Sequence, residues 1–156
     1  MKLFDKLYLN LFTKAGNKII AKDGHFELQL PEGFRYKYSG GMYQVIDPAD
    51  PSFVFQISAF ALDKNPLNDY NTDKELANAL KADPAASVRS IGRFHCIYFS
   101  SVANGSQAKI YIWKTGEQHK RILITLLIRY PSGKDTNSKV SLAEELIEGL
   151  VIKHEA

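Results

Sequence analysis

The sequence predicts an α+β domain in which an antiparallel β-sheet is flanked by helices on both faces. Residues 120–130 are apolar on both faces of a strand, which is typical of a strand covered above and below. Turn signals at Asn104-Gly105 and Gly116-Glu117 connect this stretch to two earlier strand patterns, as in an antiparallel meander. Amphipathic helix patterns at 72–82 and 138–148 provide covering layers for the sheet.

The composition is that of one globular domain spanning residues 1–156. Its hydrophobic fraction of 45% and charged fraction of 24% are ordinary, and the length allows a core without disulfides or metals. The net charge of +3 comes from scattered residues, so no basic cluster indicates nucleic-acid binding. Cys96 is the only cysteine, which excludes an intrachain disulfide.

The N-terminal residues 1–15 hold an amphipathic helix pattern, which covers 2–14 and stops before Gly16. Packing of this helix on the core is the favoured interpretation, and docking on a membrane or a partner is the alternative. Asp5 and Lys6 interrupt the continuous apolar run that a signal peptide needs. Because no transmembrane pattern is found either, we expect a cytoplasmic protein.

The first half of the chain continues with short strand patterns, each bounded by turn signals. These strands are predicted at 18–21, 26–30, 34–38, 42–46 and 53–60. Gly40-Gly41 joins two of them as a hairpin. The helix at 72–82 begins with Thr72 and Glu75 at the spacing of a capping box, and Pro84 prevents it from continuing.

The second half of the chain contains the meander and the last helix. Its strands are predicted at 87–91, 94–102, 109–114 and 120–130. A buried helix is the alternative for 120–130, but the recurring β-branched residues and the stop at Pro131 favour a strand. Gly149 ends the helix at 138–148, and residues 151–153 form a tail that is expected on the sheet edge.

The layout resembles that of a known superfamily. The pattern Phe-x-Leu-x-Leu-Pro-x-Gly-Phe occupies 26–34, Asp47-Pro48 and Ile57-Ser58 mark the next strands, and Tyr130-Pro131-Ser132 precedes the last helix. Over residues 24–152 these features resemble the PsbP-like superfamily, which includes the photosystem II extrinsic subunit, a Ran-binding nuclear import factor and the Eag-type secretion chaperones. The resemblance implies a PsbP-like α/β/α sandwich and a non-catalytic accessory or adaptor role. No catalytic or ligand residue of these proteins has a counterpart in this chain.

Patterns for a catalytic, metal or cofactor site are missing from the sequence. There is neither a Gly-x-Ser-x-Gly elbow nor a phosphate-binding loop. His95 and Cys96 are adjacent, so they face opposite sides of a strand and cannot simply pair as base and nucleophile. His25 and Glu27 share a strand face without a third metal ligand. The oxygen-rich loop 63–73 departs from the EF-hand pattern, so a solvated loop is favoured over a loose cation site.

Aromatic residues in two strand regions form the predicted binding site, because large side chains with polar tips are common at binding surfaces. The candidate residues are Arg35, Tyr36, Tyr38, Tyr43, Tyr111 and Trp113. Burial of these rings under helices or loops is the alternative interpretation. We expect a non-enzymatic protein- or peptide-binding adaptor without a cofactor or nucleic-acid partner. The alternative function is a small-ligand-binding protein or enzyme with a pocket between sheet and helix.

Overall fold

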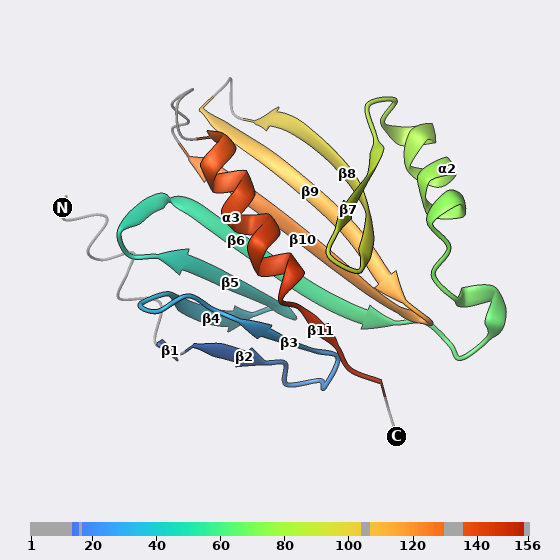
Figure 1. Cartoon of the computed structure of the whole chain (residues 1–156), viewed down its shortest axis with the longest axis horizontal. Coiled ribbons are helices and arrows are strands. Elements are labelled where there is room, and N and C mark those ends of the chain that lie inside the picture. The colour runs from blue at the N-terminus through green and yellow to red at the C-terminus, as the bar shows by residue number, and fades with distance from the viewer. Residues whose placement is uncertain (1–13, 16, 104–106, 130–135, 155–156) are drawn as a thin grey trace.

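The computed structural model describes residues 14–15, 17–103, 107–129 and 136–154. Its main element is an eight-stranded antiparallel sheet (Figure 1). In spatial order the strands are β1 (Lys14–Ala15), β4 (Arg35–Ser39), β5 (Met42–Asp47), β6 (Asp50–Ala61), β10 (Lys120–Arg129), β9 (Ala108–Glu117), β8 (Phe94–Ala103) and β7 (Ser87–Ile91). The predicted meander is confirmed, and β10 pairs with β6 on one side and β9 on the other. The Asn104-Gly105 turn lies outside the described residues.

A second, three-stranded sheet was not predicted from the sequence. Its strands, in spatial order, are β11 (Val151–Ile152), β3 (Phe26–Gln29) and β2 (Lys18–Ile20). The expectation of a single sheet is therefore corrected: the tail after the last helix pairs with β3, which lies more than a hundred residues earlier in the chain. Local sequence patterns carry no information about a pairing between segments so far apart.

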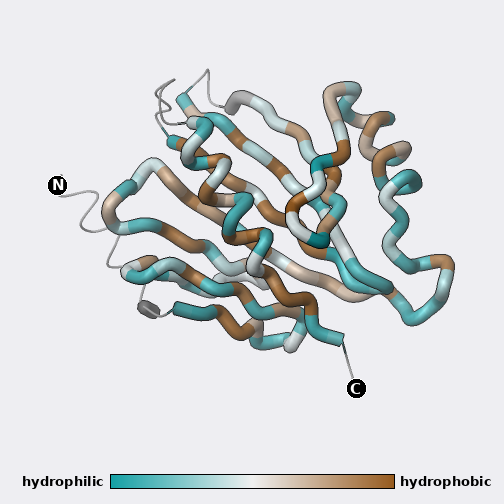
Figure 2. Tube along the Cα trace, viewed as in Figure 1, coloured by the Kyte–Doolittle hydropathy of each residue, from teal (hydrophilic) through white to brown (hydrophobic). Residues whose placement is uncertain are grey.

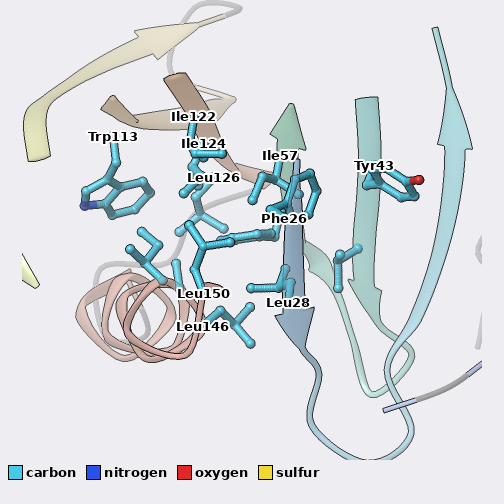
Figure 3. Packing of buried hydrophobic residues seen from close by; sticks show 14 of the residues in the cluster. Phe26, Leu28, Tyr43, Ile57, Trp113, Ile122, Ile124, Leu126, Leu146 and Leu150 are labelled. Atoms are coloured by element: carbon cyan, nitrogen blue, oxygen red, sulfur yellow. The ribbon is translucent and has the colours of Figure 1, made fainter. Parts of the chain in front are cut away.

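The core lies between the large sheet, the small sheet and the last helix, α3 (Thr136–Glu148). We call the side of the large sheet that faces α3 the inner face. On β10 it consists of Ile122, Ile124, Leu126 and Ile128, all buried. Figure 3 shows Ile122, Ile124 and Leu126 in one cluster with Phe26 and Leu28 of β3 and Leu146 of α3. Figure 2 shows hydrophobic and hydrophilic segments alternating along the strands and α3, as expected for elements that bury one side.

The opposite side of the large sheet, the outer face, is covered less completely. The helix α2 (Thr72–Ala82) contacts β8 and β7 at one edge of the sheet, and none of its residues is buried. Before it, a short 3₁₀ helix, η1 (Pro66–Asn68), lies in an exposed loop. On β10 the outer residue Leu123 is exposed and Leu127 is half-buried. An α+β fold is therefore confirmed, whereas a helical layer on both faces is not.

The structure changes the predicted start of one helix and leaves another predicted helix outside the described residues. The side chain of Asn71 accepts a hydrogen bond from the Lys74 backbone N–H at 3.0 Å, so Asn71 is the N-cap of α2 and Thr72 is its first helical residue. The predicted capping box thus began one residue too late. The helix predicted at 2–14 lies outside the described residues except for Lys14, which belongs to strand β1. No helix in the described part of the chain is long and apolar enough to cross a membrane.

Candidate functional site

The aromatic residues predicted to bind a partner lie in two separate clusters on the inner face. Tyr36, Tyr38 and Tyr43 belong to the β4–β5 hairpin, whereas Tyr111 and Trp113 lie on β9. Two other strands, β6 and β10, separate the clusters. Arg35 pairs with Ile46 and therefore points to the outer face. The predicted residues consequently do not form one contiguous patch.

The β4–β5 cluster joins the two sheets. Tyr43 is buried and meets Phe26 of the small sheet edge to face, with ring centroids 5.7 Å apart. Its hydroxyl accepts a hydrogen bond from the Lys22 backbone N–H at 2.8 Å, and burial raises the pKa of Tyr43. Tyr36 is half-buried, whereas Tyr38 is exposed with the Lys22 ammonium 4.7 Å from its ring centroid. Of these three rings, Tyr38 is the most accessible to a partner.

The β8–β9 cluster attaches α3 to the sheet. Trp113 is buried, and its indole N–H donates a hydrogen bond to the Glu144 carboxylate at 3.1 Å. Arg89 on β7 donates to the same carboxylate at 2.6 Å from Nε and 2.8 Å from Nη2. The ring of Tyr98 packs against Trp113 and stacks on Tyr111, which is half-buried. Trp113 therefore has a structural role, because it connects α3 to the sheet. Of the two predicted binding residues on β9, Tyr111 is the more accessible.

An open pocket with a volume of about 430 Å³ lies on the outer face, where β6 ends and β10 begins. We call it the outer-face pocket. It is lined by Phe60, Leu62, Tyr70, Glu75, Lys114, Thr115, Arg121, Ile122 and Leu123. The walls are open to solvent, since Phe60, Leu62 and Leu123 are 51%, 38% and 36% exposed. Exposed apolar side chains around a hollow are typical of an interaction site.

Arg121 builds one wall of this pocket by fastening the loop before α2 to the sheet. Its guanidinium donates to the backbone carbonyls of Gln118 at 2.8 Å and Asn68 at 2.7 Å. Its Nε lies 3.4 Å from the Glu75 carboxylate, so the start of α2 is tied to β10 as well. The same guanidinium lies over the ring of Tyr70, 5.4 Å from the centroid. The wall is thus held by many contacts to one side chain.

Tyr70 completes this wall through a close approach to β9. Its hydroxyl donates a hydrogen bond to the His95 backbone carbonyl, and its ring lies on Gly116. A Cβ at position 116 would come within 2.9 Å of the Tyr70 ring and 2.5 Å of the Lys120 carbonyl oxygen. Glycine is therefore the residue that this approach requires. Burial raises the pKa of Tyr70, so its hydroxyl stays protonated as a donor at neutral pH.

The charges around the outer-face pocket are unequal. Arg121 and Glu75 form an ion pair with each other. Lys114 is exposed, and its ammonium lies 5.4 Å from the ring centroid of Phe99. Within the described part of the chain, no carboxylate forms an ion pair with Lys114. The pocket therefore combines apolar walls with one positive charge that no carboxylate of the described residues neutralises.

The residues that the sequence offered as candidates for catalysis or metal binding are buried or contact other residues of the fold. Cys96 is buried, and burial raises the pKa of its thiol to about 11, so it is protonated at neutral pH. Glu27 forms ion pairs with Lys18 and Lys153 at 3.1 and 3.5 Å. The His95 ring lies 3.1 Å from the Ser90 hydroxyl on the neighbouring strand. Among the described residues, no group of three or more His, Cys, Asp or Glu side chains is placed to hold a metal ion.

The sequence did not predict the outer-face pocket, although its residues Phe60 and Leu123 were assigned to strands. Leu123 counted only as part of an apolar run, and Phe60 as the last residue of a strand. The available signal was that residues 120–130 are apolar on both faces of a strand, so each face needs cover. The pocket itself depends on Arg121 reaching Asn68, a contact between residues 53 positions apart. No local pattern predicts such a contact.

The architecture is similar to that of proteins with solved structures. No family model and no curated protein sequence matches the chain. Among solved structures, the chain resembles cyanobacterial PsbP (CyanoP) from Synechocystis sp. PCC 6803, with a TM-score of 0.56 and 11% identity over 87% of this chain and 91% of that one. The chain has a PsbP-like fold. At these identities the likeness concerns the fold alone.

Two further solved structures resemble the chain. One is a protein from Bacteroides thetaiotaomicron, with a TM-score of 0.71 and 23% identity over 91% of this chain and 50% of that one. This chain thus spans about half the length of the Bacteroides protein. The other is LpqN of Mycobacterium tuberculosis, a protein involved in cell envelope biogenesis, with a TM-score of 0.50 and 16% identity over 99% of this chain and 98% of that one.

Proposed function

We propose that this chain is a non-enzymatic module that binds a protein or peptide through the outer-face pocket. The observation that carries the proposal is the exposure of Phe60, Leu62 and Leu123 around one hollow. Contact of apolar side chains with water is unfavourable, and burying a group of them against a partner lowers the free energy. A single scattered apolar residue would need no such explanation.

The rigidity of the site supports this proposal. The pocket walls stand on β6, β9 and β10, which pair along their lengths, and Arg121 holds the remaining wall in place. A preformed site loses little conformational entropy when it binds, which favours affinity. The expected partner is a protein rather than a nucleic acid, and the cytoplasmic location stays a prediction from the sequence.

The alternative function is that of a small-ligand-binding protein or an enzyme, and the volume of the outer-face pocket supports this alternative. About 430 Å³ is within the range of small-molecule sites. Such sites normally enclose most of their ligand, whereas the apolar walls of this pocket are exposed. A large partner that covers the rim would bury these walls more completely than a small molecule could.

The proposal is tested by affinity capture from the source cells with the tagged full-length protein, read by mass spectrometry. The test variant is Phe60→Ser/Leu123→Ser. The matched control is Ile20→Ser/Val151→Ser, which changes side chains of similar exposure, 65% and 39%, on the small sheet. Circular dichroism verifies that both variants fold.

We expect a specific protein that is retained by the wild type and by the control and lost from the test variant. If the test variant retains the same proteins as the wild type, the outer-face pocket is not the binding site. If the wild type retains nothing beyond the tag alone, the adaptor function is wrong. The predicted aromatic residues are tested in the same way with Tyr38→Ala and Tyr111→Ala, because these rings are the accessible members of the two clusters.

A further inference from the structure

The charge distribution of the outer face indicates what kind of partner the outer-face pocket accepts. On β6, β9 and β10 the outer positions alternate with the inner ones, so their identities follow from the strand register. The charged residues at these outer positions are Lys114, Arg121 and Arg129. The outer positions of β9 and β10, and those of β6 that pair with β10, hold neither aspartate nor glutamate. Asp50, at the start of β6, forms an ion pair with Lys139 of α3. Beyond β5, strand β4 adds Arg35 and Lys37 on the same face.

The site is therefore cationic and apolar together. Phe60 and Leu123 are exposed on neighbouring strands at diagonal positions, so their side chains share one patch. Lys114 pairs with Leu123 across β9 and β10 and lines the same pocket. Its ammonium lies over the Phe99 ring of β8 and has no carboxylate partner among the described residues. A ligand that placed a carboxylate near Lys114 and an apolar side chain between Phe60 and Leu123 would satisfy both features at once.

An amphipathic helix supplies these two features at a regular spacing. Its apolar residues recur along one stripe, and acidic residues can border that stripe one turn apart. Helices are also the elements that normally cover an open sheet face in α+β domains. Here α2 covers only the β7–β8 edge, which leaves the sheet beside it available.

We infer that the outer-face pocket binds an acidic amphipathic helix of a partner protein, with an apolar side chain between Phe60 and Leu123 and a carboxylate against Lys114. This inference rests on the proposed function and adds the chemistry of the partner. The helical layer that the sequence predicts for this face is then completed by the partner at the pocket.

The test uses the full-length chain and two synthetic peptides of about 18 residues, each roughly 27 Å long as a helix. The first carries a leucine stripe bordered by glutamates on an alanine background, and the second has lysine in place of every glutamate. Binding is measured by fluorescence anisotropy. We expect the acidic peptide to bind, the basic peptide to bind at least tenfold more weakly, and added salt to weaken the acidic complex.

Two lysine variants locate the charge effect. Lys114→Glu should weaken binding of the acidic peptide about tenfold, because attraction becomes repulsion at the pocket. Lys22→Glu is the matched control, since Lys22 is also exposed and also lies over an aromatic ring, but on the loop between β2 and β3. The control should change the affinity less than twofold. Equal effects of the two variants would overturn the assignment of the site.

Other occupants are separate outcomes of the same design. A photoreactive benzoylphenylalanine at position 60 should cross-link to the acidic peptide; cross-links to residues 1–13 of the same chain would mean that the chain covers its own pocket. Binding of decanoate but not of the acidic peptide would overturn both this inference and the adaptor function. Binding of phosphatidylserine vesicles through Lys114, without peptide binding, would replace the partner helix with a membrane.

The two levels of the proposal fail differently. If both peptides bind equally well, or neither binds while a cellular protein is still lost with Phe60→Ser/Leu123→Ser, then the module binds a partner but not an acidic helix. If no cellular protein depends on the pocket and neither peptide binds, the proposed function itself is wrong.

Discussion

The inner and outer faces of the eight-stranded sheet contain similar apolar residues on β10 but bury them to different extents. On β10 the inner residues Ile122, Ile124, Leu126 and Ile128 are at most 1% exposed, whereas Leu123 on the outer side is 36% exposed. The inner face meets α3 and the small sheet, while α2 reaches only one edge of the outer face. An apolar strand pattern therefore indicates that a face needs to be covered, but it does not reveal how much of that face other elements of the chain cover.

This difference also separates stability from recognition. A side chain that is buried in the native monomer contributes its transfer free energy to folding. A side chain that is exposed in the monomer contributes little to folding and can contribute the same free energy to binding. The inner face should therefore respond to substitution through stability, and the outer face through partner affinity.

The largest expected effect compares two phenylalanines of the same strand, β6. Phe55 faces the core and is wholly buried, whereas Phe60 is exposed at the outer-face pocket. Phe55→Ala should lower the free energy of unfolding by about 3–5 kcal/mol, because it removes buried apolar surface and leaves a cavity. Phe60→Ala should lower it by less than about 1 kcal/mol. Urea denaturation measures both, and equal losses would show that the two faces are buried alike.

A second test uses the pH dependence of stability, through Cys96 on the inner face. Burial raises the pKa of its thiol from 9.0 to about 11 in the folded chain. The folded state therefore holds its proton more tightly, so the stabilisation is complete below pH 9 and is lost as the pH rises through 11. Over this interval the loss should reach about 2–3 kcal/mol.

Tyrosines with raised pKa values shift the pH dependence of stability in the same direction, so the contribution of Cys96 is measured against a reference variant. Burial raises the pKa of Tyr43 and Tyr98 as well. The Cys96→Ala variant keeps these tyrosines and lacks the thiol. Its stability measured from pH 8 to 11 should fall less steeply than that of the wild type. Parallel curves would mean that the thiol does not contribute.

The smallest expected effect concerns the contact between α3 and the inner face. Glu144→Ala should cost about 1–2 kcal/mol, because it leaves the buried indole N–H of Trp113 without its acceptor. Arg89→Ala removes only an exposed partner of the same carboxylate, so it should cost less than about 1 kcal/mol. Urea denaturation of the two variants measures the difference. A larger loss for Arg89→Ala would place the main stabilisation in the ion pair instead.

Much of the fold could be predicted from the sequence because its signals are local. The period of two in the strands, the turn residues and the helix stripe at 138–148 predicted most element positions. The candidate site was harder to predict. Tyr36 and Trp113 were selected as large aromatics, yet whether such a ring is buried depends on elements from elsewhere in the chain, such as Glu144 of α3.

From the sequence alone, most of the segments that become strands and helices could be determined. The meander of β8, β9 and β10 could be determined as well, since neighbouring segments joined by tight turns have few ways to pair. The tertiary structure decided that β6 pairs with β10, that β11 joins β3 in a separate sheet, and that α3 rather than α2 covers the centre of the large sheet. These outcomes depend on packing among segments far apart in the chain. Only that packing determines which apolar side chains become core and which remain exposed to solvent.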